Sequence, residues 1–219
     1  MAALWVPFLR IDGRLWMSYA PAEIQSQWVP IQMARGHVAV GGLGMGYVAM
    51  AMAARPEVEK VVVFERDDRV LRMFNDLNPD PFPGSTKIKV VMGDLYEELP
   101  KYEPPGGEWD LVYMDPYLKR ASVEAVRDTI TLWLGRKVKT KAYRFWAQEE
   151  ITRYLVRSMG VRPPREMFSV HDARFFRLFD STVQLREHNN FQNDLLAKVA
   201  AMAFARDAKA RRAIDKVTE

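Results

Sequence analysis

The chain of 219 residues contains no cysteine and only three histidines, His37, His171 and His188. The lack of cysteine excludes disulfide bonds and thiolate metal ligands, and the histidines share no spacing typical of a metal site. The sequence also has no apolar run of the roughly 18 residues that a membrane-spanning helix needs, and its N-terminus does not have the layout of a signal peptide. We therefore expect no metal site, no membrane contact and a cytoplasmic location.

Neither sign of charge dominates, because the chain has 32 lysine and arginine residues and 28 acidic residues, which gives a net charge of +4. This mild excess permits a nucleic-acid partner but does not require one. Hydrophobic residues make up 48% of the chain, which is ordinary for a globular domain with a core. We find no internal repeat and no phosphate-binding P-loop, since no glycine-rich stretch ends in Gly-Lys-Ser/Thr.

The most informative stretch runs from His37 to Glu65. Its pattern predicts a strand over 38–40, a turn of alternating glycines, a helix over 47–54 and a buried strand over 61–64. Glycine lets the backbone of such a turn pass close to a ligand. Glu65 follows the second strand, about 20 residues after the last glycine, a spacing at which a carboxylate meets ribose hydroxyls. The third glycine of the dinucleotide fingerprint would fall on Tyr47, which disfavours a pyrophosphate-binding turn.

Further strands are predicted around 88–91, 109–114 and 142–146, and helices after Asp67, over 95–99, after Ser122 and over 149–159. Two short strands, 167–170 and 175–179, are joined by a connection so tight that they must be antiparallel. The predicted fold is α/β, with a mostly parallel sheet of seven strands and a terminal antiparallel hairpin. In such a sheet the glycine turn, Glu65, Asp94 and Asp115 would meet at the carboxyl ends of the strands.

The glycine turn, in the order G-x-G-x-G, resembles motif I of the Rossmann-like class I S-adenosylmethionine-dependent methyltransferases, and more weakly the turn of spermidine synthases. This resemblance implies S-adenosyl-L-methionine as the cofactor. The turn would pass under its methionine part, Glu65 would accept from both ribose hydroxyls and Asp94 from the adenine amine. Leu95 would pack on the adenine ring, and Arg66 would flank the adenosine. The implied cofactor-binding residues are Gly42, Leu43, Gly44, Met45, Gly46, Glu65, Arg66, Asp94 and Leu95.

Asp115-Pro116-Tyr117 resembles motif IV of the amino methyltransferases, D/N-P-P-Y, and this implies catalytic roles for Asp115 and Tyr117 in methyl transfer to nitrogen. Two departures from the family patterns leave other functions open. Asp115 is followed by one proline, and Val40 stands where many methyltransferases carry an acid. The alternatives are a catalytically silent member of the fold that acts in an assembly, and a spermidine synthase-like aminopropyltransferase.

The ends of the chain extend this domain. Residues 1–30 are predicted to form a β-hairpin around Asp12-Gly13 and a short helix after Pro21. The hairpin resembles a shortened spermidine synthase extension, or simply seals the sheet. We expect residues 31–186 to form the Rossmann-like domain and 187–219 a basic C-terminal helix, which either is solvated or contacts another subunit. The basic stretch from Arg136 to Lys141 is a candidate nucleic-acid contact or a solvated loop.

Overall fold

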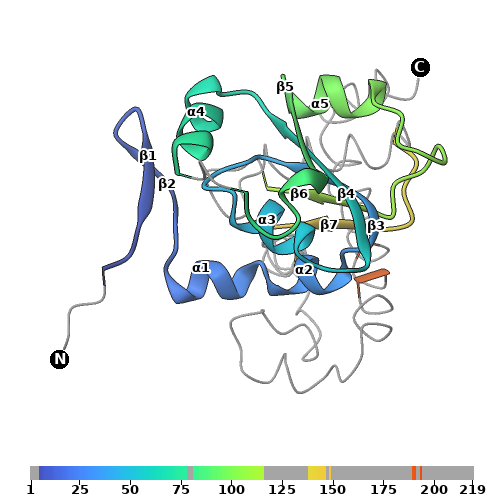
Figure 1. The fold of residues 1–219 in the computed structure, drawn as a ribbon, viewed down its shortest axis with the longest axis horizontal. Coiled ribbons are helices and arrows are strands. Elements are labelled where there is room, and N and C mark those ends of the chain that lie inside the picture. The colour runs from blue at the N-terminus through green and yellow to red at the C-terminus, as the bar shows by residue number, and fades with distance from the viewer. Residues whose placement is uncertain are drawn as a thin grey trace, which may run out of the picture.

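The computed structural model describes residues 5–77, 81–115, 138–146, 148, 189, 190 and 193. A five-stranded sheet in the order β5-β4-β3-β6-β7 forms its centre, and all four neighbouring pairs are parallel (Figure 1). The strands are β3 (Gly36–Gly41), β4 (Val58–Glu65), β5 (Ile88–Met92), β6 (Leu111–Met114) and β7 (Tyr143–Phe145). In chain order this is the third, second, first, fourth and fifth strand, the doubly wound order whose switch point lies between the first and the fourth.

This topology confirms the predicted α/β, Rossmann-like fold with a mostly parallel sheet. It does not confirm the predicted count of seven strands, because the strands expected over 167–170 and 175–179 lie outside the described residues. Strand lengths also differ from the prediction. β4 begins at Val58 rather than at residue 61, and β6 begins at Leu111, with Trp109 making only an isolated bridge to Thr140.

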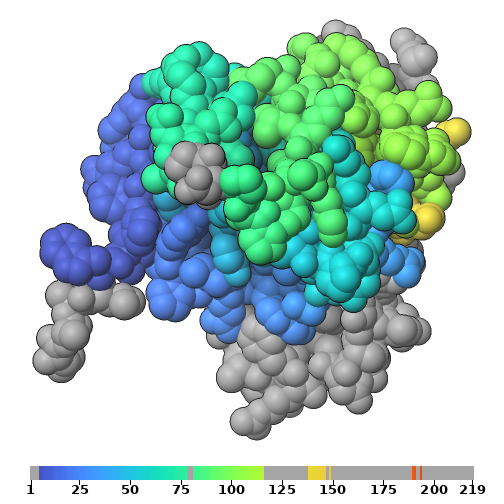
Figure 2. All heavy atoms as spheres, in the orientation of Figure 1, coloured from blue at the N-terminus to red at the C-terminus, as the bar shows by residue number. Residues whose placement is uncertain are grey.

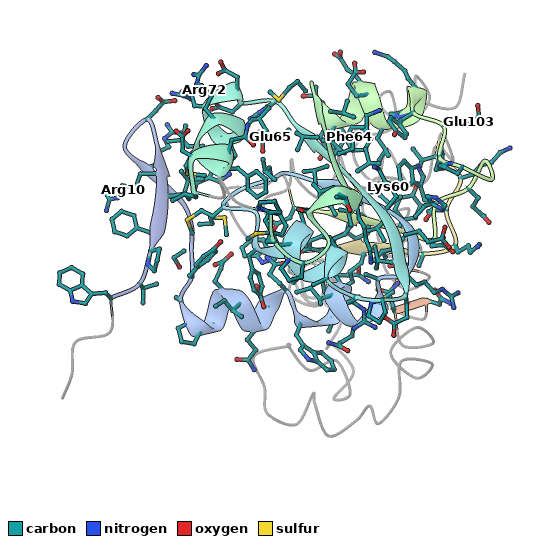
Figure 3. All side chains as sticks on the ribbon, viewed as in Figure 1. Arg10, Lys60, Phe64, Glu65, Arg72 and Glu103 are labelled. Carbon is teal, nitrogen blue, oxygen red and sulfur yellow. The ribbon has the colours of Figure 1, made fainter. Side chains whose placement is uncertain are left out.

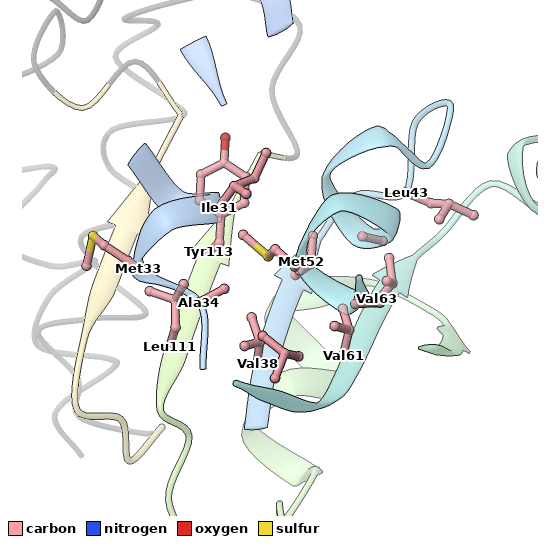
Figure 4. Close-up of a cluster of buried hydrophobic side chains, with 14 of the residues drawn as sticks. Ile31, Met33, Ala34, Val38, Leu43, Met52, Val61, Val63, Leu111 and Tyr113 are labelled. Atoms are coloured by element: carbon pink, nitrogen blue, oxygen red, sulfur yellow. The ribbon is translucent and has the colours of Figure 1, made fainter. Parts of the chain in front are cut away.

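Three helices cover one face of the sheet: α2 (Trp28–Met33), α3 (Tyr47–Ala53) and α4 (Asp68–Leu77). Their apolar residues form one buried cluster with alternate residues of β3 and β4, and Met52 lies between the helices and the strands (Figure 4). Ala49, Met52 and Ala53 are the buried residues of α3. The cluster therefore fixes where the glycine turn leaves β3 and enters α3.

The opposite face is covered by α5 (Leu95–Glu98). Two 3₁₀ turns, η1 (Ser85–Lys87) and η2 (Leu99–Lys101), flank β5 and α5 along the chain. Phe64, which alternates with the residues of the first face, packs edge-to-face on Tyr102 at 5.8 Å between ring centroids. Tyr102 in turn packs on the buried Trp109 at 5.5 Å. Both faces of β4 are thus buried, as its unbroken apolar sequence predicts.

The predicted N-terminal hairpin is confirmed as β1 (Phe8–Ile11) and β2 (Arg14–Ser18), which pair antiparallel. Asp12 and Gly13 both have positive φ, 50° and 75°, as a two-residue turn of this kind requires. The hairpin stands beside α4 (Figures 1 and 2), and Asp12 forms an ion pair with Arg69 of α4 at 2.9 Å.

The short helix expected after Pro21 is two helices, α1 (Pro21–Ser26) and α2, separated at Gln27. Pro30 explains the break, since it has no N–H to donate to the carbonyl of Ser26 four residues earlier. Proline is tolerated in the first turn of α2, where an N–H would have no helical partner. The break matters for the site, because it presents the side chain of Gln27 to the sheet.

Several predicted segments lie outside the described residues: Tyr117, the helices expected after Ser122 and over 149–159, and nearly all of the C-terminal helix. Within the described part of the chain, each helix falls short of the length and apolarity needed to cross a bilayer.

Candidate functional site

The carboxyl ends of four neighbouring strands are joined side by side by backbone hydrogen bonds. The N–H of Gly93, after β5, donates to the carbonyl of Glu65 at 2.9 Å, and the N–H of Gly42 donates to Phe64 at 2.9 Å. The N–H of Asp115, after β6, donates to the carbonyl of Gly41 at 2.9 Å. The glycine turn, Glu65, Gly93-Asp94 and Asp115 therefore share one edge of the sheet, which we call the strand-end edge.

The glycine turn has the backbone conformation that its composition suggests. Gly42, Gly44 and Gly46 have φ values of 93°, 52° and 84°, a region that residues with a side chain rarely adopt. The structure also gives a packing reason for two of them. A Cβ on Gly44 would collide with the thioether of Met17, and one on Gly46 would collide with the ring of Phe74.

The turn is covered by the N-terminal segment. The N–H of Met45 donates to Sδ of Met17 at 2.9 Å, and the hydroxyl of Tyr19 donates to the carbonyl of Met45 at 2.9 Å. The Tyr19 ring packs edge-to-face on Tyr47, with 6.0 Å between centroids. Both peptide groups of Met45 are thus bonded to residues that precede the sheet, and Leu43 and Met45 are buried.

Glu65 lies at the end of β4 beside α4 (Figure 3), and its side chain is buried, with 8% of the residue exposed. Oε2 accepts from the N–H of Leu43 at 2.9 Å. Oε1 accepts from the N–H groups of Arg66 at 2.8 Å and Asp67 at 2.9 Å. The carboxylate therefore ties the glycine turn to the start of α4. A carboxylate has about four acceptor positions, so Oε2 keeps capacity for another donor.

Asp94 is the N-cap of α5, since Oδ1 accepts from the N–H of Tyr96 at 2.8 Å. Oδ2 has no hydrogen bond to any of the described residues. The capping role and a ligand role, both considered from the sequence, are therefore compatible. Leu95 is buried, and its side chain lies where a Cβ on Gly41 would stand, at the end of β3.

Asp115 is partly buried and accepts from Nε2 of Gln27 at 3.0 Å. Oε1 of the same amide accepts from the hydroxyl of Tyr113, so Gln27 bridges the tyrosine and the carboxylate. Tyr113 is fully buried, and burial raises its pKa well above the ordinary value, with the nearby Asp115 charge adding to the shift. Tyr113 therefore stays protonated and acts as a donor.

Of the remaining predicted residues, Arg66 directly follows Glu65 at this edge, and its N–H donates to Oε1 of Glu65. Arg66 is exposed, and Tyr117, Arg136 and Lys137 lie outside the described residues. Of the basic stretch, Lys141 pairs with Asp110 at 2.8 Å. Asp110 also binds the N–H of His37, at the start of β3 and thus at the opposite end of the sheet.

The sequence did not point to Met17, Tyr19 or Gln27 as site residues. Each lies before the sheet in the chain and reaches the strand-end edge only through the fold, at sequence separations of 26 to 88 residues. The one signal available was Pro30, which predicts a helix break next to a polar residue. Among the described residues there is no group of three or more His, Asp or Glu that could hold a metal ion.

The strand order and the strand-end edge define a Rossmann-like α/β domain whose switch point lies between β3 and β6. No protein-family model matches the chain, and no curated protein matches it in sequence. Among solved structures, spermidine synthase from Thermotoga maritima is similar with a TM-score of 0.43 and 15% identity, covering 84% of this chain and 78% of that one.

Two further solved structures align over a shorter part of this chain. YcgJ from Bacillus subtilis has a TM-score of 0.40 and 14% identity, covering 57% of this chain and 50% of that one. The methyltransferase domain of bacterial CtHen1-C has a TM-score of 0.40 and 11% identity, covering 56% of this chain and 65% of that one. Spermidine synthases and methyltransferases are also the two groups whose motifs the sequence resembles. At these identities the likeness concerns the fold.

Proposed function

We propose that this protein binds S-adenosylmethionine along the strand-end edge and transfers its methyl group to a nitrogen atom of an acceptor. The observation that carries the proposal is the lateral bonding of the four strand ends, which puts the glycine turn, Glu65, Asp94 and Asp115 on one edge. Ligands of open parallel sheets bind outside this edge, at the switch point. That point lies between β3 and β6, where the N–H of Asp115 bonds Gly41.

The residues present fit the adenosyl part of the cofactor. Oδ2 of Asp94, which no described residue bonds, is available to accept from an adenine amine. Oε2 of Glu65 keeps acceptor capacity for a ribose hydroxyl. Leu95, directly after Asp94, is the apolar residue that we assign to contact with the adenine ring. Gly42, at the start of the turn, has a positive φ and carries no side chain that would stand between its backbone and a ligand.

When bound, the cofactor supplies an electrophilic methyl carbon on a sulfonium. Because the methyl group would pass directly to the acceptor nitrogen, the main task of this chain's residues would be to orient the amine. Asp115 accepts a hydrogen bond from the amine and takes up the proton that the nitrogen loses. We assign Tyr117 to contact with the acceptor, as the motif resemblance implies.

Calorimetric titration with S-adenosylhomocysteine tests the cofactor, and Asp94→Asn tests the residue roles. The amide oxygen of asparagine still caps α5, because Asn and Asp are similar N-caps. Its NH₂ replaces Oδ2 with a donor, which would face the adenine amine. We expect the variant to unfold at the same temperature as the wild type but to bind at least about tenfold more weakly, the value of a hydrogen bond to a charged group.

The matched control is Asp68→Asn, an acid at an exposed position of α4 that pairs only with Arg72 among the described residues. It should leave binding unchanged. No heat from the wild type at high micromolar ligand would overturn the proposed cofactor. If Asp94→Asn binds as tightly as the wild type, Asp94 only caps α5 and does not contact the cofactor.

The acceptor is tested by incubating the protein with S-adenosylmethionine labelled in the methyl group and, separately, with a single-stranded oligonucleotide or a mixture of polyamines. Transfer of label to either acceptor, abolished in Asp115→Ala, supports methyl transfer. Consumption of decarboxylated S-adenosylmethionine with aminopropyl transfer would instead identify a spermidine synthase-like activity. Ligand binding without any transfer would favour a silent member of the fold.

A further inference from the structure

Gln27 has an unusual place for a polar side chain. It lies at the break between α1 and α2, is only 3% exposed, and uses both ends of its amide on residues in and directly after β6. Nε2 donates to Oδ2 of Asp115 at 3.0 Å, and Oε1 accepts from the hydroxyl of Tyr113. A buried amide that meets two partners from a segment more than 80 residues away constrains both of them.

The chemistry of the two partners fixes which way the amide points. Tyr113 keeps its proton, because burial and the charge of Asp115 disfavour the phenolate and so raise its pKa. A hydroxyl that donates requires the amide oxygen on its side, so the NH₂ of Gln27 faces the carboxylate. The opposite orientation would put the amide oxygen against the negative charge of Asp115.

The segment that carries Gln27 is held to the sheet independently of this amide. The indole N–H of Trp146, directly after β7, donates to Oγ of Ser26 at 3.0 Å. The Ser26 hydroxyl in turn donates to the carbonyl of Glu23 at 2.6 Å. Residue 27 therefore stays opposite the ends of β6 and β7 even when its own side chain is changed.

We propose that Gln27 is a positioning residue for Asp115, with Tyr113 setting the orientation of its amide. This inference rests on the proposed function, in which the Asp115 carboxylate binds the acceptor amine. The backbone of Asp115 is fixed by Gly41, and Gln27 fixes the side chain by holding Oδ2. A hydrogen bond donated to the charged form also keeps the carboxylate ionised, as an acceptor of the amine's proton must be.

Charges near the network come from three elements. Apart from Asp115 itself, Arg144 of β7 and Glu23 of α1 act on the pKa of the Tyr113 hydroxyl, with opposite signs. Arg144 is buried, with 2% exposed, and lies beside Tyr113 in the register of β6 and β7. Neither residue is altered by the substitutions at Gln27 and Tyr113, which remove only the amide or the hydroxyl.

The experiment is a ¹³C NMR titration of the aspartate carboxyl carbons, with Asp115 identified by the signal lost in Asp115→Asn. Gln27→Met keeps the length of the side chain but removes donor and acceptor. We expect it to raise the pKa of Asp115 by about one, the value of roughly 1.4 kcal/mol of lost hydrogen bonding. Tyr113→Phe, which removes only the orienting hydroxyl, should raise it by less.

The control is Tyr143→Phe, another buried tyrosine, whose hydroxyl donates to the carbonyl of Val138 at 3.1 Å. It should leave the Asp115 titration unchanged. An unchanged titration in Gln27→Met, or in Tyr113→Phe where the first variant does not fold, overturns the inference. The titration needs no ligand, so its outcome is separate from that of calorimetry with S-adenosylhomocysteine, which alone decides the cofactor.

Discussion

Single glycines of the turn are constrained by the protein itself as well as by any ligand. Gly46 has a φ of 84°, and a Cβ there would meet the ring of Phe74. Gly106 has nearly the same φ, 82°, but a Cβ added at that position would meet nothing within 4 Å. The two positions therefore separate backbone strain from crowding.

We expect Gly46→Ala to lower the free energy of unfolding by about 2–3 kcal/mol, and Gly106→Ala by about 1 kcal/mol, the ordinary cost of a left-handed alanine. Urea unfolding of the two variants measures the difference. Equal losses would show that Phe74 moves aside freely, so that crowding has no part in the requirement for glycine at residue 46.

The sequence could predict Glu65 as an acceptor at the strand-end edge, because its place after a buried strand follows from local pattern. It could not predict that the N–H groups of Leu43, Arg66 and Asp67 all converge on this carboxylate. Those contacts depend on how the turn and the start of α4 fold back on the strand end. A loss of ligand binding in Glu65→Ala would therefore combine a lost ribose contact with a loosened turn.

At the scale of elements, the hairpin was predictable and its docking was not. Asp12-Gly13 between alternating apolar residues is a strong local signal for a two-residue turn. The contacts that hold the hairpin, Met17 on the glycine turn and Asp12 on Arg69, join segments far apart in the chain. An isolated two-stranded hairpin is at best marginally stable, so these contacts keep it in place.

Met17→Leu tests this docking, because leucine keeps the apolar bulk but cannot accept the N–H of Met45. We expect the amide hydrogen of Met45 to exchange with solvent about three- to tenfold faster, the effect of losing one weak hydrogen bond. Met92→Leu, the same change at an exposed end of β5, is the control and should alter no exchange rate on the turn. Unchanged exchange in Met17→Leu would mean that the thioether of Met17 does not protect the N–H of Met45.

For the whole molecule, the mostly parallel α/β fold was the most predictable property, since it follows from short apolar strands that alternate with helices. The pH dependence of stability needs the tertiary contacts instead. Burial raises the pKa of Asp110, but hydrogen bonds from Lys141 and the N–H of His37 outweigh it, and the net pKa is lowered. A carboxylate with a lowered folded pKa stabilises the fold above its unfolded pKa and ceases to do so as the pH falls through the folded one.

Asp110→Asn should therefore lower stability at pH 7, by about 1 kcal/mol, and make the remaining loss of stability below about pH 4 shallower. Denaturant unfolding at about pH 7, 4 and 3 measures both effects. If the variant and the wild type lose stability in the same way at low pH, that loss arises from other carboxylates. Candidates are Asp12 and Asp67, whose pKa values are lowered by Arg69.

At alkaline pH, the dependence of the free energy of unfolding on pH involves buried tyrosines of β6 and β7. Burial raises the pKa of Tyr113, with Asp115 contributing, and burial alone raises that of Tyr143. Above about pH 10 the unfolded chain loses these protons while the folded chain retains them. The unfolded state then binds fewer protons, so stability must fall as the pH rises, by up to about 1.4 kcal/mol per pH unit for each tyrosine.

We expect Tyr143→Phe to remove one such contribution and the double variant with Tyr113→Phe to remove two, measured by urea unfolding between about pH 9 and 11. If the slope of the free energy of unfolding against pH is the same in the double variant and the wild type, the loss of stability at alkaline pH comes from groups elsewhere in the chain.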